Sequence, residues 1–384
     1  MIYVHIPFCR SFCTYCDFYS EVAAKCRGAE GQARQEELFG RYSKALGREI
    51  SLRAGEMSDN MNTLYIGGGT PSVLPLSVYT SLIDDLSRAG IEGPFEEFTF
   101  EANPEDIADR GEAYVEGLMK LGVNRFSMGV QSFDDGILKW MNRRHDSETA
   151  RRAYAILENA GAENISIDLI FGLPQLSDSL WSETMEKALA ISSKGVLPRH
   201  ISSYQLSVEP GSALAKLMDR GVWSEASDEL CAHQYEMLCR TLAEAGYHHY
   251  EISNFACPGF EARHNSAYWA HIPYTGLGPG AHSFMPSMRK WNNPDLKAYI
   301  TDPLSVQEYE TLDEEQLVLE KIMLALRTSG GLSGEFLNNH VEKAVLESAL
   351  KTGDLIPSDI SGNLRIPESR FFVSDNIIAY LCGG

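Results

Sequence analysis

Near its start the chain reads YVHIPFCRSFCTYCDF, from Tyr3 to Phe18. Within this run Cys9, Cys13 and Cys16 have the spacing C-x3-C-x2-C. Iron–sulfur clusters are commonly held by four cysteine thiolates. Three thiolates from one short loop can hold three corners of such a cluster and leave one iron open to another ligand. The spacing therefore predicts an iron–sulfur cluster with a reactive position.

Two other uses of cysteine fit the sequence less well. Structural zinc usually takes two separated pairs of ligands, and no second pair follows here. Disulfide frameworks are typical of short secreted chains, whereas this chain has 384 residues and its first residues do not have the pattern of a signal peptide. We expect the remaining cysteines to be buried apolar residues; they are Cys26, Cys231, Cys239, Cys257 and Cys382.

Length and charge limit the class of protein. The chain is long enough for more than one domain, and it has no run of eighteen apolar residues that would predict a membrane span. A net charge of −20 disfavours nucleic acid as a partner, because an acidic surface repels phosphates. We expect a cytoplasmic protein. The polar segment 23–41 is expected to be a mobile excursion before the first helix.

Strand and helix patterns alternate along the first two hundred residues. Helical spacing of apolar residues is found at 113–121 and 149–160, between short β-rich runs. This alternation predicts a parallel sheet, either open or closed into a partial barrel. The six β-rich runs are 2–6, 63–66, 98–101, 125–129, 165–169 and 200–206.

Polar residues and glycines lie where these strands are expected to end. Parallel α/β folds place their active sites at the carboxyl ends of strands. Glu101 and Asp168 can accept hydrogen bonds from an amine or a ribose, and Gln131 can both donate and accept. Arg143 can hold a carboxylate through two parallel bonds, and the glycines at 67–69 allow close backbone approach to a ligand. Together these groups suit a ligand with ammonium, carboxylate, ribose and adenine parts.

The last part of the chain has a different character. From about Asp313 the pattern predicts a helix at 314–327, with Asp313 as N-cap and Gln316 three residues on. A second helix at about 334–350, a hairpin of 363–366 with 371–373, and a last helix at 377–380 are expected to follow. This order is typical of a winged-helix unit, in which the acidic balance disfavours DNA binding and favours a lid or docking role.

Taken together, these motifs resemble the radical S-adenosylmethionine (SAM) superfamily. Within it they are similar to the oxygen-independent coproporphyrinogen III oxidase-like family, and most similar to its heme chaperone HemW branch. The match covers nearly the whole chain. The motifs that carry it, besides the cysteine run, are GGGTPS at 67–72, EANPE at 101–105, SMGVQSF at 127–133, NRRH at 142–145, DLIFGLP at 168–174 and HNSAYW at 264–269.

The resemblance implies an α/β fold: a partial (β/α)6 TIM-type barrel at 1–220, a connecting region at 221–305 and a C-terminal winged-helix-like α+β domain at 306–384. It makes Cys9, Cys13 and Cys16 ligands of a [4Fe–4S] cluster. The open iron would bind the amino and carboxylate groups of SAM, and the reduced cluster would cleave SAM to methionine and a 5′-deoxyadenosyl radical.

The resemblance also assigns residues to SAM. Those that would line a first SAM site are Tyr3, Gly68 and Glu101. Those that match contacts to a second SAM in the dehydrogenase are Tyr15, Gly69, Thr70, Gln131, Arg143 and Asp168. Two departures point away from the dehydrogenase: Phe18 stands where it has a further cysteine, and only about two residues precede the first strand here.

His264 begins the HNSAYW run. The residues alone favour a core histidine that packs among aromatic side chains, whereas the resemblance implies that His264 contacts heme iron. The first functional hypothesis is a chaperone that binds heme and passes it to apo-hemoproteins. The second is an enzyme that decarboxylates coproporphyrinogen III to protoporphyrinogen IX with an external electron donor. A tRNA-modifying radical SAM enzyme is disfavoured by the acidic charge.

Overall fold

The computed structural model describes residues 1–22, 29–57 and 62–383. Its centre is a nine-stranded sheet with the order β11-β1-β4-β5-β6-β7-β8-β10-β9. Neighbouring strands from β1 to β8 in this order are parallel, so the six predicted strands are confirmed. They are β1 (Ile2–Ile6), β4 (Thr63–Gly68), β5 (Glu97–Ala102), β6 (Arg125–Gln131), β7 (Ile165–Phe171) and β8 (His200–Gln205).

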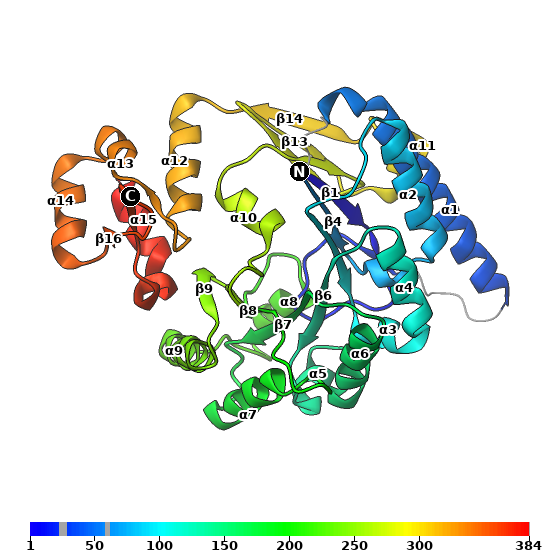
Figure 1. Ribbon diagram of the computed structural model, residues 1–384, viewed down its shortest axis with the longest axis horizontal. Coiled ribbons are helices and arrows are strands. Elements are labelled where there is room, and N and C mark those ends of the chain that lie inside the picture. Colours follow the sequence, from blue (N-terminus) through cyan, green and yellow to red (C-terminus); the bar gives the residue numbers. More distant parts are fainter. Residues whose placement is uncertain (23–28, 58–61, 384) are drawn as a thin grey trace.

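Three strands from the predicted connecting region complete the sheet. β11 (Thr275–Leu277) pairs in parallel with β1, and β10 (Asn254–Ala256) pairs antiparallel with β8. β9 (His248–Glu251) pairs with β10 and lies at the far edge from β11. The sheet curls without closing, as Figure 1 shows, and this is the partial barrel that the resemblance implies.

Helices cover the outer face of the sheet (Figure 1). Alternation along β6 explains why the sheet has two different faces: Phe126, Met128 and Val130 join the hydrophobic core, whereas Arg125 and Ser127 line the interior. No helix among the described residues is both long enough and apolar enough to cross a membrane. The helices of this part are α1 (Ala29–Leu52), α2 (Leu76–Arg88), α3 (Pro104–Arg110), α4 (Glu112–Lys120), α5 (Asp135–Trp140), α6 (Ser147–Asn159), α7 (Asp178–Leu189), α8 (Ala213–Asp219), α9 (Asp228–Glu244) and α10 (Arg263–Trp269).

The expectation that residues 23–41 form a mobile excursion is wrong for most of this segment. Residues 29–41 form the first half of α1, and residues 23–28 lie outside the described part of the chain. Most described residues of this half are exposed, while the apolar face of Phe39, Tyr42 and Leu46 is buried. Because that face begins only near the middle of the helix, the early turns carry little apolar periodicity.

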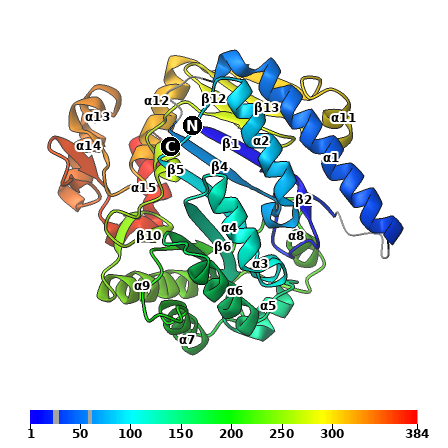
Figure 2. The ribbon, with the colours of Figure 1, turned by 45° about the vertical axis from the view of Figure 1, so that its right-hand side comes forward.

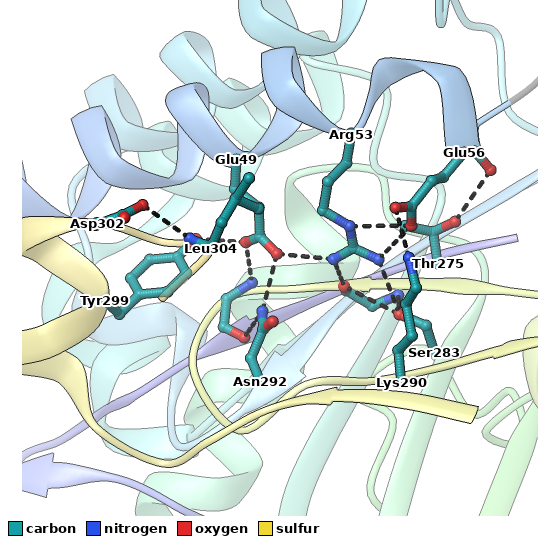
Figure 3. Close-up of polar contacts among 12 residues, drawn as sticks. Glu49, Arg53, Glu56, Thr275, Ser283, Lys290, Asn292, Tyr299, Asp302 and Leu304 are labelled. Carbon is teal, nitrogen blue, oxygen red and sulfur yellow. Dashed lines mark hydrogen bonds and ion pairs between the residues drawn. The ribbon is translucent and has the colours of Figure 1, made fainter. Parts of the chain in front are cut away.

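A buried polar cluster joins α1 to the segment that follows the barrel (Figure 3). Arg53 Nη1 donates to Glu49 Oε1 at 2.7 Å and to the carbonyl of Gly276 at 2.7 Å. Glu49 Oε2 accepts from Tyr299 Oη at 2.6 Å and from the amide of Gly278 at 2.8 Å. The elements held in this way are β11, β12 (His282–Met285), β13 (Met288–Asn292) and α11 (Leu296–Thr301), and β14 (Gln307–Thr311) pairs with β13.

The C-terminal unit lies on one side of the barrel, away from α1, in both ribbon views (Figures 1 and 2). Its small sheet has the order β15-β17-β16, and helix, strand, helix, helix and two strands follow one another as in a winged helix. The predicted capping box of Asp313 and Gln316 is confirmed. The elements are α12 (Glu314–Ala325), β15 (Leu332–Ser333), α13 (Gly334–His340), α14 (Lys343–Thr352), β16 (Ile356–Pro357), β17 (Asn363–Arg365) and α15 (Ser374–Leu381).

Two expectations for this unit are wrong. The helix expected at 334–350 is two helices, α13 and α14, separated at Val341 and Glu342, whose backbones are not helical. The hairpin expected between 363–366 and 371–373 does not form, because β17 pairs with β15 and β16. Residues 368–373 form a 3-10 helix that buries Phe371. Tertiary burial of this ring overrides the strand-like pattern of its sequence.

Candidate functional site

A cavity of about 750 Å³ runs through the inside of the partial barrel. Each residue that the resemblance assigns to a cofactor lines this one cavity, although these residues come from distant parts of the chain, whereas Gly67 of the glycine run does not line it. The residues assigned in this way are Tyr3, Cys9, Cys13, Tyr15, Cys16, Gly68, Gly69, Thr70, Glu101, Gln131, Arg143, Asp168 and His264.

The cysteine loop is held in place by the segment that follows α5. Thr14 donates through its amide to the carbonyl of Met141 at 3.1 Å and through Oγ1 to that of Trp140 at 2.9 Å. Asn142, with a φ of 59°, donates from Nδ2 to the carbonyl of Phe12 at 2.7 Å. These contacts fix the backbone between Cys9 and Cys16 against the barrel rim, so the thiols face a defined space.

The three cysteines are free thiols that share one end of the cavity. Burial raises the pKa of Cys9, and it raises that of Cys16 to about 12. A nearby positive charge would stabilise their thiolate forms. Among the described residues, no group of three or more His, Cys, Asp or Glu side chains is arranged to hold a single metal ion. A cluster, whose irons occupy separate corners, fits this set of thiols.

The glycine run at the end of β4 packs mainly against protein. A Cβ at Gly69 would lie 2.7 Å from the carbonyl oxygen of Phe8, and one at Gly68 would lie 2.7 Å from the ring of His5. Gly68 also has a φ of 105°, which glycine adopts without strain. The missing side chains therefore allow β1 and the backbone of Phe8 to pack closely against the end of β4. Gly68 and Gly69 also line the cavity.

Two carboxylates form the acidic part of the cavity. Glu101 accepts from Tyr65 Oη at 2.6 Å and from the amide of Gly68 at 3.2 Å. Burial, together with the negative charge of Asp168, raises the pKa of Glu101 to about 7 despite these bonds. Asp168 accepts from Ser127 Oγ at 3.1 Å, and burial raises its pKa to about 6. A cationic ligand would stabilise the ionised form of both groups.

Arg143 is already engaged by the protein. Its Nη2 donates to Asn103 Oδ1 at 2.9 Å and to the carbonyl of Gly129 at 2.8 Å, and Nη1 donates to Cys13 Sγ at 3.4 Å. The two-bond grip on a ligand carboxylate that the sequence suggested stays a prediction: Nη2 already donates to two protein oxygens, whereas Nε has no partner among the described residues. In this arrangement the guanidinium orients Cys13 and places a positive charge beside its sulfur.

His264 lies at the other end of the barrel from the cysteines. Its Nδ1 is 2.7 Å from Thr63 Oγ1 and its Nε2 is 3.0 Å from Tyr268 Oη, so both ring nitrogens have partners. Burial lowers the pKa of His264 to about 3, which keeps the ring neutral. Thr63 begins β4 and Gly68 ends it, which separates His264 from the cysteine end by roughly 16 Å of strand.

The helix that carries His264 closes the deep end of the cavity. Glu97 accepts from the amides of Arg263 at 2.7 Å and His264 at 2.9 Å, which satisfies donors at the N-terminus of α10. The HNSAYW run thus has a clear packing role in addition to any contact with a ligand.

Sequence reasoning missed several residues of the cavity. Arg125, Ser127 and Tyr65 line it. None of them lies at the carboxyl end of a strand, where the sequence analysis expected the site. The alternation of Arg125 and Ser127 with apolar residues along β6 is the signal that could have found them.

Comparison with known proteins places these features in a family. Residues 3–188 match the model of the radical SAM superfamily. The chain is 34% identical over 365 residues to the heme chaperone HemW of Synechocystis, covering 92% of this chain and 84% of that protein. It is 33% identical to the heme chaperone HemW of Escherichia coli, covering 73% of this chain and 69% of the relative.

The fold agrees with this assignment. Coproporphyrinogen III oxidase (HemN) from Escherichia coli, a radical SAM enzyme, has a solved structure that superposes with a TM-score of 0.78 at 21% identity, covering 99% of this chain and 89% of that one. With a three-cysteine loop on a matching barrel and curated relatives aligned along most of its length, the chain belongs to the HemW family of the radical SAM superfamily.

Proposed function

We propose that the protein is a heme chaperone that binds heme and passes it to apo-hemoproteins. The observation that carries the proposal is that the residues assigned to cofactors by the resemblance all line one cavity, in a chain that aligns with the heme chaperone HemW of Synechocystis over 92% of its length. The test is hemin titration of the purified protein followed by transfer to a b-type apo-cytochrome. We expect about one hemin per chain, and faster transfer from the loaded protein than from hemin on albumin.

In this proposal Cys9, Cys13 and Cys16 hold a [4Fe–4S] cluster, and Glu101 and Asp168 bind the cationic and ribose parts of SAM. When bound and reduced by an external electron donor, the cluster supplies the electron for cleavage of SAM. The chain's own contribution is to orient the thiols through Arg143 and Asn142, and to surround the SAM site with buried carboxylates.

SAM affinity is expected to rise with pH. The pKa of Glu101 is about 7 in the ligand-free fold, so below that pH a cationic ligand must displace a proton before it meets a carboxylate. Affinity should fall by up to about tenfold per pH unit between 7 and 6, fall more steeply below 6, where Asp168 also takes up a proton, and level off above 7. Isothermal titration of SAM at a series of pH values from 5.5 to 8.5 measures the dependence.

The Glu101→Gln variant is the matched control, because it keeps the shape of the side chain and cannot ionise. Its SAM affinity should change little between pH 7 and 6 and should fall only below about 6, the pKa of Asp168. A wild-type affinity that does not change with pH would remove Glu101 from the cation site.

Heme contact through His264 requires release of a hydrogen bond. Its Nε2 lies 3.0 Å from Tyr268 Oη, so iron can reach this nitrogen only when the tyrosine hydroxyl moves away. Tyr268→Phe frees Nε2 and is expected to increase hemin affinity several-fold, whereas His264→Ala should remove the spectrum of histidine-ligated heme. Soret titrations of the three proteins, each checked for an intact fold, measure both effects.

The opposite pattern would give His264 a structural role only. If His264→Ala lowers the melting temperature but keeps the wild-type heme spectrum and affinity, the side chain holds α10 against Thr63 and Tyr268 and does not bind iron.

A further inference from the structure

The deep end of the cavity contains an arginine, Arg125, whose charge is not neutralised by direct contact with any group in the part of the chain that the structure describes. Arg125 is 3% exposed and lines the cavity. Its Nε is fully buried and has no hydrogen-bond partner among the described residues. The ion pairs found in the described part of the chain all join other side chains.

This arrangement is unusual because a buried charge is costly unless it is paired. Arg53 is the other arginine buried to this degree among the described residues, and Arg143 is half-buried with an Nε that also has no partner. Arg53 forms ion pairs with Glu49 and Glu56, and Arg143 donates to Asn103 and Gly129. Arg125 differs from both, because among the described residues no hydrogen bond or ion pair is formed by any nitrogen of its guanidinium.

The nearby acidic groups are committed elsewhere. Asp168 accepts from Ser127, and Glu101 accepts from Tyr65 and the amide of Gly68. Both carboxylates feel the positive charge of Arg125, which opposes the rise of their pKa values, yet neither lies within ion-pair distance of it. They do not supply the direct contact that the guanidinium lacks.

The neutral groups around Arg125 are also engaged. Both ring nitrogens of His200 have partners, Ser166 Oγ at 2.8 Å and Tyr250 Oη at 2.8 Å. Those of His264 are held by Thr63 and Tyr268, as described above. Burial lowers the pKa of both histidines, and the positive charge of Arg125 lowers them further, so Arg125 remains the cation that faces the ligand space here.

We propose that Arg125 binds a carboxylate of the ligand that occupies the deep end of the cavity. A guanidinium matches a carboxylate through two parallel hydrogen bonds. In the form that rests on the proposed function, this carboxylate is a heme propionate. The amino acid end of SAM also carries a carboxylate. However, Arg125 and Gln131 lie at opposite ends of β6, so Arg125 is roughly 20 Å along the strand from the end of the barrel that carries the cysteines.

The test compares hemin with hemin dimethyl ester, which lacks free carboxylates. Wild-type protein should bind hemin about tenfold or more tightly than the ester, as expected for a charge-assisted pair. In Arg125→Met this preference should fall to about one, and Arg125→Lys should keep part of it. SAM affinity should stay the same in both variants. Arg110→Met, which changes an arginine outside the cavity, is the matched control and should keep the preference.

The other outcomes show whether the carboxylate belongs to heme or to SAM, and whether the role of Arg125 or the chaperone function is wrong. A loss of SAM affinity in Arg125→Met with the hemin preference intact assigns the carboxylate to SAM. If a folded Arg125→Met, judged by circular dichroism, keeps both the hemin preference and the SAM affinity, the proposal is wrong. If wild-type protein binds neither porphyrin, the chaperone function fails, while the SAM comparison still tests Arg125 by itself.

Discussion

Replacing Cys13 with alanine is expected to abolish the iron–sulfur cluster. Three thiols share the cysteine end of the cavity, and Arg143 Nη1 donates to Cys13 Sγ at 3.4 Å. Loss of this thiol leaves two protein ligands where clusters commonly have four thiolates, and it leaves the Arg143 charge without its sulfur partner. Iron after anaerobic reconstitution should fall from about four atoms per chain to a small fraction of that.

The matched control is Cys382→Ala. Cys382 is also a free, partly buried cysteine, but it follows α15 and does not line the cavity. Iron and sulfide analysis of the control should match the wild type. Full iron content in Cys13→Ala, or equal loss in Cys382→Ala, would show that the cluster is held in another way.

Replacing Arg53 with methionine is expected to produce a large loss of stability. The Arg53 and Glu49 side chains are 3% and 0% exposed, and the two groups are 2.7 Å apart. Removal of the guanidinium leaves the Glu49 carboxylate buried without its cation, and breaking a buried pair in this way costs about 3–5 kcal/mol. The carbonyl of Gly276 loses a donor as well, so α1 and β11 should separate more easily. Urea unfolding followed by circular dichroism measures the change.

Arg88→Met gives the comparison for this experiment. Arg88 also forms an ion pair on a helix, with Asp85 at 2.6 Å, but its side chain is 74% exposed. Exposed pairs contribute about 0–1 kcal/mol, so its unfolding curve should nearly overlay that of the wild type. Similar small losses in both variants would contradict the structural role given to the buried cluster of Figure 3.

The sequence predicted well those features that depend on regular patterns. Strands such as β6 combine β-rich composition with a helix on either side, and this local pattern is enough to locate them. The cofactor residues could be predicted to meet because parallel strands bring their carboxyl ends to one edge. The Asp313 and Gln316 capping box was predictable from a spacing of three residues.

Other features depend on contacts that no local pattern encodes. Arg143 looked like a free carboxylate clamp, and only the fold reveals that its Nη1 and Nη2 donate to Cys13, Asn103 and Gly129. β11 consists of three residues, one of them Gly276, and becomes a strand because β1 offers an edge. Nor could the sequence indicate that Arg125 lacks a partner, because that is a property of everything around it.

The most direct test of the account is an anaerobic turnover assay with coproporphyrinogen III. The reconstituted protein, checked for iron, is incubated with SAM and a strong reductant, and HemN from Escherichia coli serves as the active comparison. A heme chaperone should form no protoporphyrinogen IX beyond background, whether or not 5′-deoxyadenosine appears. Protoporphyrinogen IX produced over many turnovers would contradict the account and make the protein a decarboxylating enzyme.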